Sequence, residues 1–187
     1  MNLVERVKGI LLQPKSEWQV IEREPGNAGY LFPNYVAIVA AIPPVCAFIG
    51  LSIVGYGPFR LGIVSGILHA VVVYVLSLIS VFVVAYVIDF LAGTFGARKN
   101  LDNAMKISAY APTAAWVAGV FKIIPALAFL GILGLYSLYL LYTGIVALMK
   151  PAADKALIYT IAVIVCVVVI WTIVFAIPAA LFGVGMM

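Results

Sequence analysis

The chain has few groups that could carry out chemistry. Its 187 residues include one histidine, two cysteines and seven acidic residues, and 10% are charged. Cys46 and Cys166 lie inside apolar runs, so we expect buried thiols rather than a disulfide framework or a zinc site. The sequence contains no HExxH, GxSxG or P-loop motif, and Asp89 is the one carboxylate inside an apolar run. We therefore predict no catalytic residue, no cofactor and no metal site, and we do not expect an enzyme.

Apolar runs, in contrast, make up most of the chain. Hydrophobic residues are 66% of the sequence, and the mean hydropathy is +1.21. A soluble domain of this size needs a polar surface that this composition does not supply. The predicted fold class is all-α, a polytopic membrane helix bundle of one domain (34–187) that follows a short N-terminal arm (1–33). Five spans are assigned, at about residues 34–54, 61–92, 103–121, 125–148 and 156–182.

The third span is the weakest of these assignments. Fifteen residues separate Lys106 from Lys122, so this span requires both lysines to reach toward the membrane surfaces. A re-entrant segment is the alternative. A re-entrant segment would move the last two connectors to the opposite sides of the membrane. It would thereby reduce the excess of basic residues on the inside, so five passes are favoured.

Basic residues are distributed unevenly over the connectors. With five spans and a cytoplasmic N-terminus, nine fall on the inside and two, Arg60 and Lys122, on the outside. The nine are Arg6, Lys8, Lys15, Arg23, Arg98, Lys99, Lys106, Lys150 and Lys155. This bias predicts a cytoplasmic N-terminus and an outside C-terminus. We interpret the net charge of +4 as a topology signal that also attracts anionic headgroups at the cytoplasmic face, and not as a nucleic-acid surface.

The arm is predicted to be amphipathic. Leu3, Val4, Val7, Ile10 and Leu11 would share one helical face, and Trp18 and Ile21 would lie on the apolar side of a second short helix. We expect the arm to lie on the cytoplasmic membrane surface. The alternative is an arm packed on the protein's own loops. Because the first thirty residues carry four acids and no long apolar core, we expect no cleavable signal peptide.

Small residues and prolines predict how the helices pack and bend. Gly62, Gly66 and Ala70 recur every four residues and form a stripe that allows another helix to approach closely, either in the same bundle or in a second protomer. A homo-oligomer is therefore possible. Pro43, Pro44 and Pro112 interrupt apolar runs, so we expect kinks there. His69, next to the stripe, is expected to form a hydrogen bond between helices.

Polar residues are predicted to gather at one depth in the cytoplasmic half of the bundle. The candidate site consists of Asp89, Lys106, Tyr110, Tyr139, Tyr142, Tyr159 and Lys155. An ionised aspartate in lipid is costly, so Asp89 should face a cation, with Lys106 as the first choice and Arg98 or Lys155 next. The cluster could bind a lipid headgroup, an ion or a partner segment. It could equally be a structural ion pair surrounded by interfacial tyrosines.

Several short motifs resemble the Yip family of five-span membrane proteins, first described as partners of Ypt/Rab GTPases. They are Thr94-Phe95-Gly96 after the second span, Lys106 with Ala109-Tyr110-Ala111-Pro112, the run from Gly134 to Gly144 with its tyrosines, and Pro151 with Asp154-Lys155-Ala156. The resemblance covers about residues 30–180, and the arm with Pro14 and Trp18 is similar to that of bacterial members. It implies five helices, a cytoplasmic N-terminus and an outside C-terminus, and we expect a location in the bacterial inner membrane. A Rab-type role is not implied, because the arm is short.

These observations predict a non-enzymatic membrane protein that binds lipids or membrane-protein partners as a scaffold or organiser. The alternative is a transporter, channel or lipid-translocating protein that uses the polar cluster around Asp89. The presence of proline in four of the five spans supports this alternative.

Overall fold

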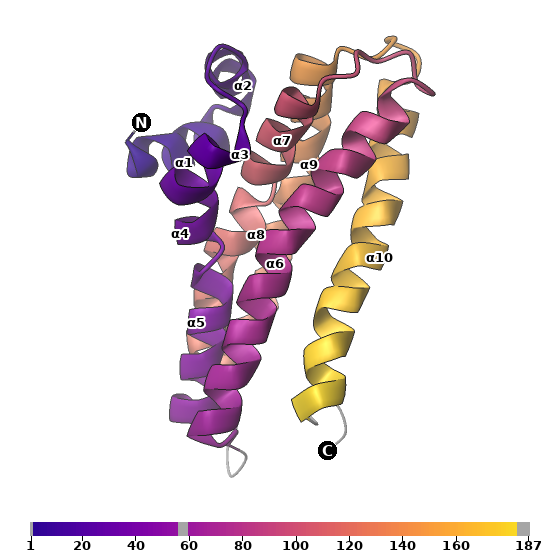
Figure 1. The fold of residues 1–187 in the computed structure, drawn as a ribbon. Coiled ribbons are helices and arrows are strands. Elements are labelled where there is room, and N and C mark those ends of the chain that lie inside the picture. The colour runs from indigo at the N-terminus through magenta and orange to yellow at the C-terminus, as the bar shows by residue number, and fades with distance from the viewer. Residues whose placement is uncertain (1, 56–59, 183–187) are drawn as a thin grey trace.

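The computed structural model describes residues 2–55 and 60–182, and every regular element within those ranges is a helix (Figure 1). Four helical stretches are long and apolar enough to cross a membrane: Ala28–Val54, Ile63–Ala92, Pro125–Met149 and Ala156–Leu181. The predicted all-helical membrane fold is therefore confirmed. The number of five spans stays a prediction, because the segment around Lys106 does not meet the same criteria.

The arm forms two helices, α1 (Leu3–Leu12) and α2 (Pro14–Glu22). The side chain of Asn2 caps α1 by accepting a hydrogen bond from the Val4 amide at 3.1 Å. Pro14 is the first residue of α2. Amide protons in the first turn have no acceptor within the helix, so proline costs no hydrogen bond there. Ile10, Trp18 and Ile21 are completely buried against the bundle. These three side chains are therefore covered by the helices of the bundle, whereas Val4, Leu12 and Val20 of the arm are exposed. The position of the arm on the membrane surface stays a prediction.

The first long helix consists of five short pieces. They are α3 (Ala28–Leu31), η1 (Phe32–Val36), α4 (Ala37–Val39), α5 (Ile42–Phe48) and η2 (Ile49–Val54). The helix starts before the predicted residue 34, because the Asn27 side chain caps it through the Tyr30 amide at 2.9 Å. It breaks between Val39 and Ile42, just before Pro43-Pro44, as expected from the loss of two amide donors.

Two uninterrupted helices pack side by side, α6 (Ile63–Ala92) and α10 (Ala156–Phe182). Their bounds lie close to the predicted 61–92 and 156–182. Both are apolar on all sides, as expected for helices in lipid. Much of α10 is exposed in the isolated chain, and it is the least buried of the four long helical stretches.

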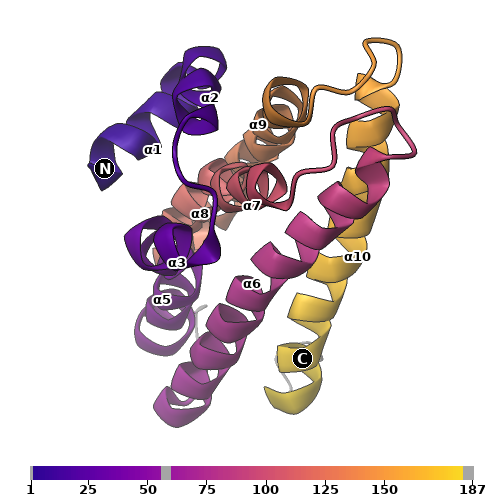
Figure 2. The same cartoon turned by 45° about the horizontal axis from the view of Figure 1, so that its top comes forward.

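The third segment comprises α7 (Leu101–Tyr110), α8 (Thr113–Ala118) and η3 (Gly119–Ile123). Asn100 caps α7, and the helix is interrupted at Ala111–Pro112, where the kink was predicted. Every residue from Ala104 to Ala111 is buried. This segment lies between the arm side of the molecule and the α6–α10 pair, as Figure 2 shows. It can carry more polar residues than its neighbours because protein surrounds it.

The fourth segment comprises η4 (Pro125–Leu135), α9 (Tyr136–Gly144) and η5 (Ile145–Met149). It ends at Lys150, which has a left-handed backbone with φ of 48°. The arm, the connector after α6 and the connector before α10 meet at one end of the bundle, and α10 ends at the other (Figure 1). The basic residues assigned to the inside therefore share one end of the molecule.

Glycines determine where the helices approach most closely. A Cβ atom at Gly119 would lie 2.8 Å from Pro43, and one at Gly50 would overlap the Lys122 carbonyl oxygen. In the predicted stripe, Gly66 packs against Ser52 and Phe48, whereas a Cβ at Gly62 would meet no atom within 4 Å. The stripe is thus a helix contact at Gly66 and not at Gly62, because Gly62 lies exposed at the start of α6.

Candidate functional site

The predicted Asp89–Lys106 pair does not form. Lys106 is buried, and its ammonium group donates to the Glu22 carbonyl oxygen at 2.9 Å and to Asn103 Oδ1 at 3.4 Å. Asp89 lies on α6 beside Tyr159, whose hydroxyl group donates to the Ile88 carbonyl oxygen. Asp89 Oδ1 is buried and has no hydrogen-bond partner among the described residues. Lys106 therefore binds the arm and not Asp89. Sequence spacing could not predict this, because it gives no position for the arm relative to the bundle.

Four other members of the predicted cluster separate as well, whereas Tyr159 stays beside Asp89. Tyr110 is completely buried under the arm, while Tyr139, Tyr142 and Lys155 are exposed. The rings of Tyr136 and Tyr139 lie 5.4 Å apart on the outer face of α9. Equal depth in a bilayer therefore did not mean a shared site, because these side chains point in different directions around their helices.

A buried ion cluster instead links the two helices of the arm and meets the bundle at Tyr110. Arg6 is 5% exposed and forms ion pairs with Glu17 and Glu24. Its guanidinium carbon lies 5.6 Å from the centre of the Tyr110 ring, a cation–π distance. Tyr110 packs edge-on against Tyr35 with ring centres 4.5 Å apart. The charge of Arg6 is therefore neutralised inside the protein and does not face lipid headgroups.

Two further contacts fasten the arm to the fourth segment. Trp18 Nε1 donates to Thr143 Oγ1 at 3.1 Å, and a Cβ at Gly144 would lie 2.8 Å from the Trp18 ring. Lys150 Nζ lies 2.6 Å from Glu22 Oε1. This hydrogen bond to Lys150 lowers the pKa of Glu22 below its ordinary value. The arm thus contacts the fourth segment through the buried Trp18 side chain and through the Glu22–Lys150 pair.

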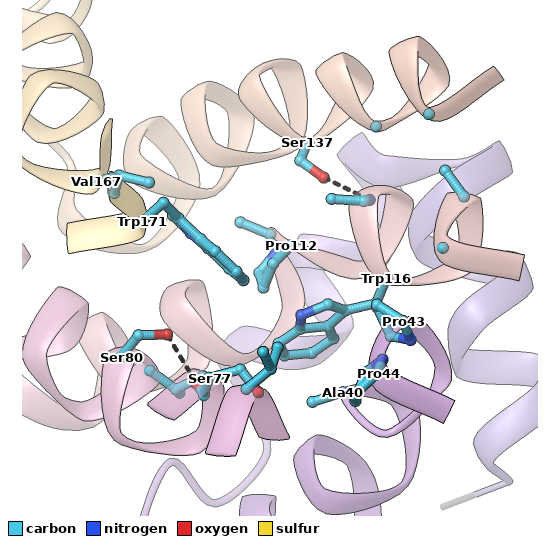
Figure 3. Close-up of a pocket in the computed structure, with 18 of the residues that line it drawn as sticks. Ala40, Pro43, Pro44, Ser77, Ser80, Pro112, Trp116, Ser137, Val167 and Trp171 are labelled. Carbon is cyan, nitrogen blue, oxygen red and sulfur yellow. Dashed lines mark hydrogen bonds between the residues drawn. The ribbon is translucent and has the colours of Figure 1, made fainter. Parts of the chain in front are cut away.

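A cavity of about 430 Å³ lies among the helices (Figure 3). It is lined by the first helix, α6, the third and fourth segments and α10. Its wall includes the three predicted kink residues Pro43, Pro44 and Pro112, and it also includes Ser77, Ser80, Trp116, Ser137 and Trp171. Breaks in the first helix and the third segment occur where the wall is formed, so the kinks shape this space.

The polar groups of the wall are mostly bonded within the protein. Ser77 Oγ donates to the Tyr74 carbonyl oxygen and Ser80 Oγ to the Ser77 carbonyl oxygen, each at 2.7 Å. Ser137 Oγ accepts from the Ala115 amide at 3.0 Å. Trp116 differs, because it is 2% exposed and its Nε1 has no hydrogen-bond partner among the described residues. The wall is therefore mostly apolar, and the Trp116 indole N–H in it has no partner among the described residues.

The cavity opens sideways between the fourth segment and α10. Leu135 and Phe175 both line it, and they are 61% and 51% exposed in the isolated chain. Lys122 from η3 reaches toward α10 at this opening, where its ammonium nitrogen lies 5.8 Å from the centre of the Phe175 ring. In a bilayer such an opening faces lipid rather than water.

Sequence reasoning missed the cavity because no single motif marks it. Trp116 and Trp171 read as residues of an aromatic zone near the membrane surface, which needs no ligand. The sequence signal that could have marked it was the set of prolines Pro43, Pro44 and Pro112. Their common position at one cavity is visible only in the structure. The described residues contain no group of three or more His, Cys, Asp or Glu side chains that could hold a metal ion.

Comparisons with known proteins agree with the fold. A family model described as "Yip1 domain" matches residues 8–185. The protein named "Inner membrane protein YohC" from Escherichia coli strain K12 is 30% identical over 127 residues, and the same holds for the protein of that name from E. coli O6:H1 strain CFT073. The alignment covers 65% of this chain and 65% of each relative. No solved structure matches the chain. The predicted Yip-family membership is thus confirmed, and the chain belongs to the Yip1 domain family.

Proposed function

We propose that this protein is a non-enzymatic scaffold of the bacterial inner membrane that holds the acyl chain of a membrane lipid between its helices. The observation that carries the proposal is the laterally open, apolar cavity beside Pro43, Ser77 and Trp116. Its volume of about 430 Å³ lies within the range of small-molecule sites. An acyl chain fits an apolar wall whose serine hydroxyl groups are bonded to the protein itself.

The membrane location and the orientation belong to the same proposal. The relatives named as inner-membrane proteins support the location, and the grouping of basic residues at the arm end supports a cytoplasmic N-terminus with five passes. On the docked arm, Lys8, Lys15 and Arg23 remain exposed. These residues supply a basic surface for anionic headgroups or for a membrane-protein partner at the cytoplasmic end.

A cavity-filling variant tests the lipid site. Ser77→Leu removes a hydroxyl group bonded to its own helix and places a larger apolar side chain in the cavity. Thr172→Leu is the matched control, since Thr172 Oγ1 donates to the Val168 carbonyl oxygen and its side chain is exposed on α10. We expect Ser77→Leu to lower lipid adducts several-fold in native mass spectrometry of protein released from nanodiscs, and Thr172→Leu to leave them unchanged.

Equal adducts in the two variants would contradict the lipid site. The alternative of transport is tested in vesicles of the same lipids by ion-flux and lipid-scrambling assays. Flux or scrambling that is lost in Asp89→Asn or Lys106→Ala would replace the scaffold proposal by the transport alternative. The positions of these residues favour the scaffold, because Lys106 binds the arm and Asp89 lies beside Tyr159 instead.

A further inference from the structure

We infer that the cavity selects a phospholipid with a net negative headgroup, whose phosphate binds Lys122 at the end of the bundle opposite the arm. This inference rests on the proposed function and adds the headgroup class, the residue that recognises it and the membrane face on which it lies. The occupant is a single phospholipid, with an acyl chain among the apolar wall residues and its headgroup at the lateral opening.

Lys122 lies at the edge of the cavity, where it can reach a lipid phosphate. Lys122 lines the cavity and lies in η3, where the backbone of the third segment packs against Gly50 near the end of the first long helix. Its ammonium group is held at the opening by the Phe175 ring, 5.8 Å away. No ion pair of Lys122 occurs among the described residues, whose ion pairs all involve the arm. A cation at the edge of an apolar cavity is placed to bind a lipid phosphate.

The charges of the cavity wall favour an anionic headgroup. Lys122 is the charged residue among the described residues that line the cavity, and no acidic residue lines this part. A zwitterionic lipid would bring an ammonium or choline group that finds no carboxylate there and is repelled by Lys122. An anionic headgroup brings no such cation, so it is favoured by charge complementarity.

Trp116 provides a hydrogen-bond donor for the lipid at a second position of the wall. It precedes Lys122 by six residues on the same segment, which corresponds to a rise of about 9–12 Å in α- or 3₁₀-helical geometry. Its indole N–H is buried at the cavity wall and lacks a partner among the described residues. A buried donor of this kind costs free energy unless an acceptor reaches it. An ester carbonyl oxygen of the lipid, deeper in the membrane than the phosphate, provides that acceptor.

The test uses the full chain in nanodiscs that contain equal amounts of phosphatidylglycerol and phosphatidylcholine. Native mass spectrometry then gives the ratio of the two lipids that remain bound. We expect the wild-type protein to retain phosphatidylglycerol preferentially. Lys122→Gln should lower the bound ratio about fivefold, which corresponds to about 1 kcal/mol for one lysine near a membrane surface. Lys122→Arg should preserve the preference.

Arg60→Gln is the matched control, because Arg60 is an exposed basic residue before α6 at the same end of the bundle and does not line the cavity. It should keep the wild-type ratio. Trp116→Phe should lower both lipids about fivefold without changing their ratio, since it removes a neutral hydrogen bond worth about 1 kcal/mol. Circular dichroism and size-exclusion chromatography establish that each variant is folded.

The outcomes separate this inference from the proposed function. A wild-type ratio in Lys122→Gln, or an equal loss of preference in Arg60→Gln, would overturn the headgroup assignment even if Ser77→Leu still reduces total lipid. Total lipid that is unaffected by Ser77→Leu would overturn the cavity site itself. Loss of preference in Lys122→Gln together with loss of lipid in Ser77→Leu supports both.

Discussion

At the scale of single residues, the buried charge of Arg6 holds the two helices of the arm together against Tyr110. Arg6 carries its charge into a site that is nearly closed to solvent, between the side chains of Glu17 and Glu24 and beside the Tyr110 ring. Such a pair contributes little by itself, because both partners lose hydration. Removal of one partner is costly, because the remaining charges are left close together without compensation.

We therefore predict that Arg6→Met separates the two arm helices and loosens the arm at Tyr110. The loss of the cation leaves two carboxylates next to each other and should destabilise the docked arm by about 3 kcal/mol. Hydrogen exchange of residues 3–22 in nanodiscs would measure it as faster exchange. Lys8→Met is the control, because Lys8 is exposed on the same helix and its loss should leave exchange unchanged. Equal protection in both variants would show that the ion cluster does not hold the arm.

At the scale of elements, the third segment is the centre of the bundle. It packs against the first helix through Gly119 and Pro43, and against the fourth segment through Ala115 and Gly134. Close approach of helix backbones is a main source of helix association in lipid, where apolar side chains gain little from burial against one another. The position of this segment therefore depends on small residues at its contacts.

Gly119→Ala should destabilise the bundle. Its new Cβ would lie 2.8 Å from Pro43, so α5 and η3 would have to separate, at a cost of about 1–3 kcal/mol. Gly62→Ala is the control, since a Cβ there meets no atom within 4 Å. Thermal unfolding in detergent, followed by tryptophan fluorescence, measures the difference. A melting temperature of Gly119→Ala equal to that of Gly62→Ala would argue against tight packing at Pro43.

At the scale of the whole molecule, the arm and the end of α10 lie at opposite ends of the bundle (Figure 1). The basic connectors share the arm end, while Arg60 and Lys122 belong to the other. From this distribution the positive-inside rule predicts that the arm end is cytoplasmic. The third segment contributes to this arrangement even though its composition is less apolar than that of the four long helices.

Topology reporters test the orientation. We predict that a reporter fused before Met1 is active in the cytoplasm and that one fused after Met187 is active outside it. A third reporter in the connector between α6 and α7 should match the first. Agreement between the two terminal reporters would require an even number of crossings and would invalidate the five-pass assignment, most directly at the segment that contains Lys106.

Much of this molecule follows from the order of its residues. Membrane embedding and the helical class follow from long apolar runs, and the kinks at Pro43-Pro44 and Pro112 follow from missing backbone donors. The motifs around Tyr110 and Gly144 also indicated the family. These features depend on local composition and on properties of single residues, which the chain carries with it regardless of its neighbours.

The partners of the polar groups were decided by the tertiary structure alone. Spacing placed Lys106 at the same depth as Asp89, but its ammonium group donates to the Glu22 carbonyl oxygen of the folded arm. The stripe made contact at Gly66 and not at Gly62. The cavity required the interrupted first helix and third segment to lie together with α6, the fourth segment and α10. Depth along a helix can be estimated from sequence spacing, whereas the rotation of each helix and the position of the arm depend on how all the segments pack at once.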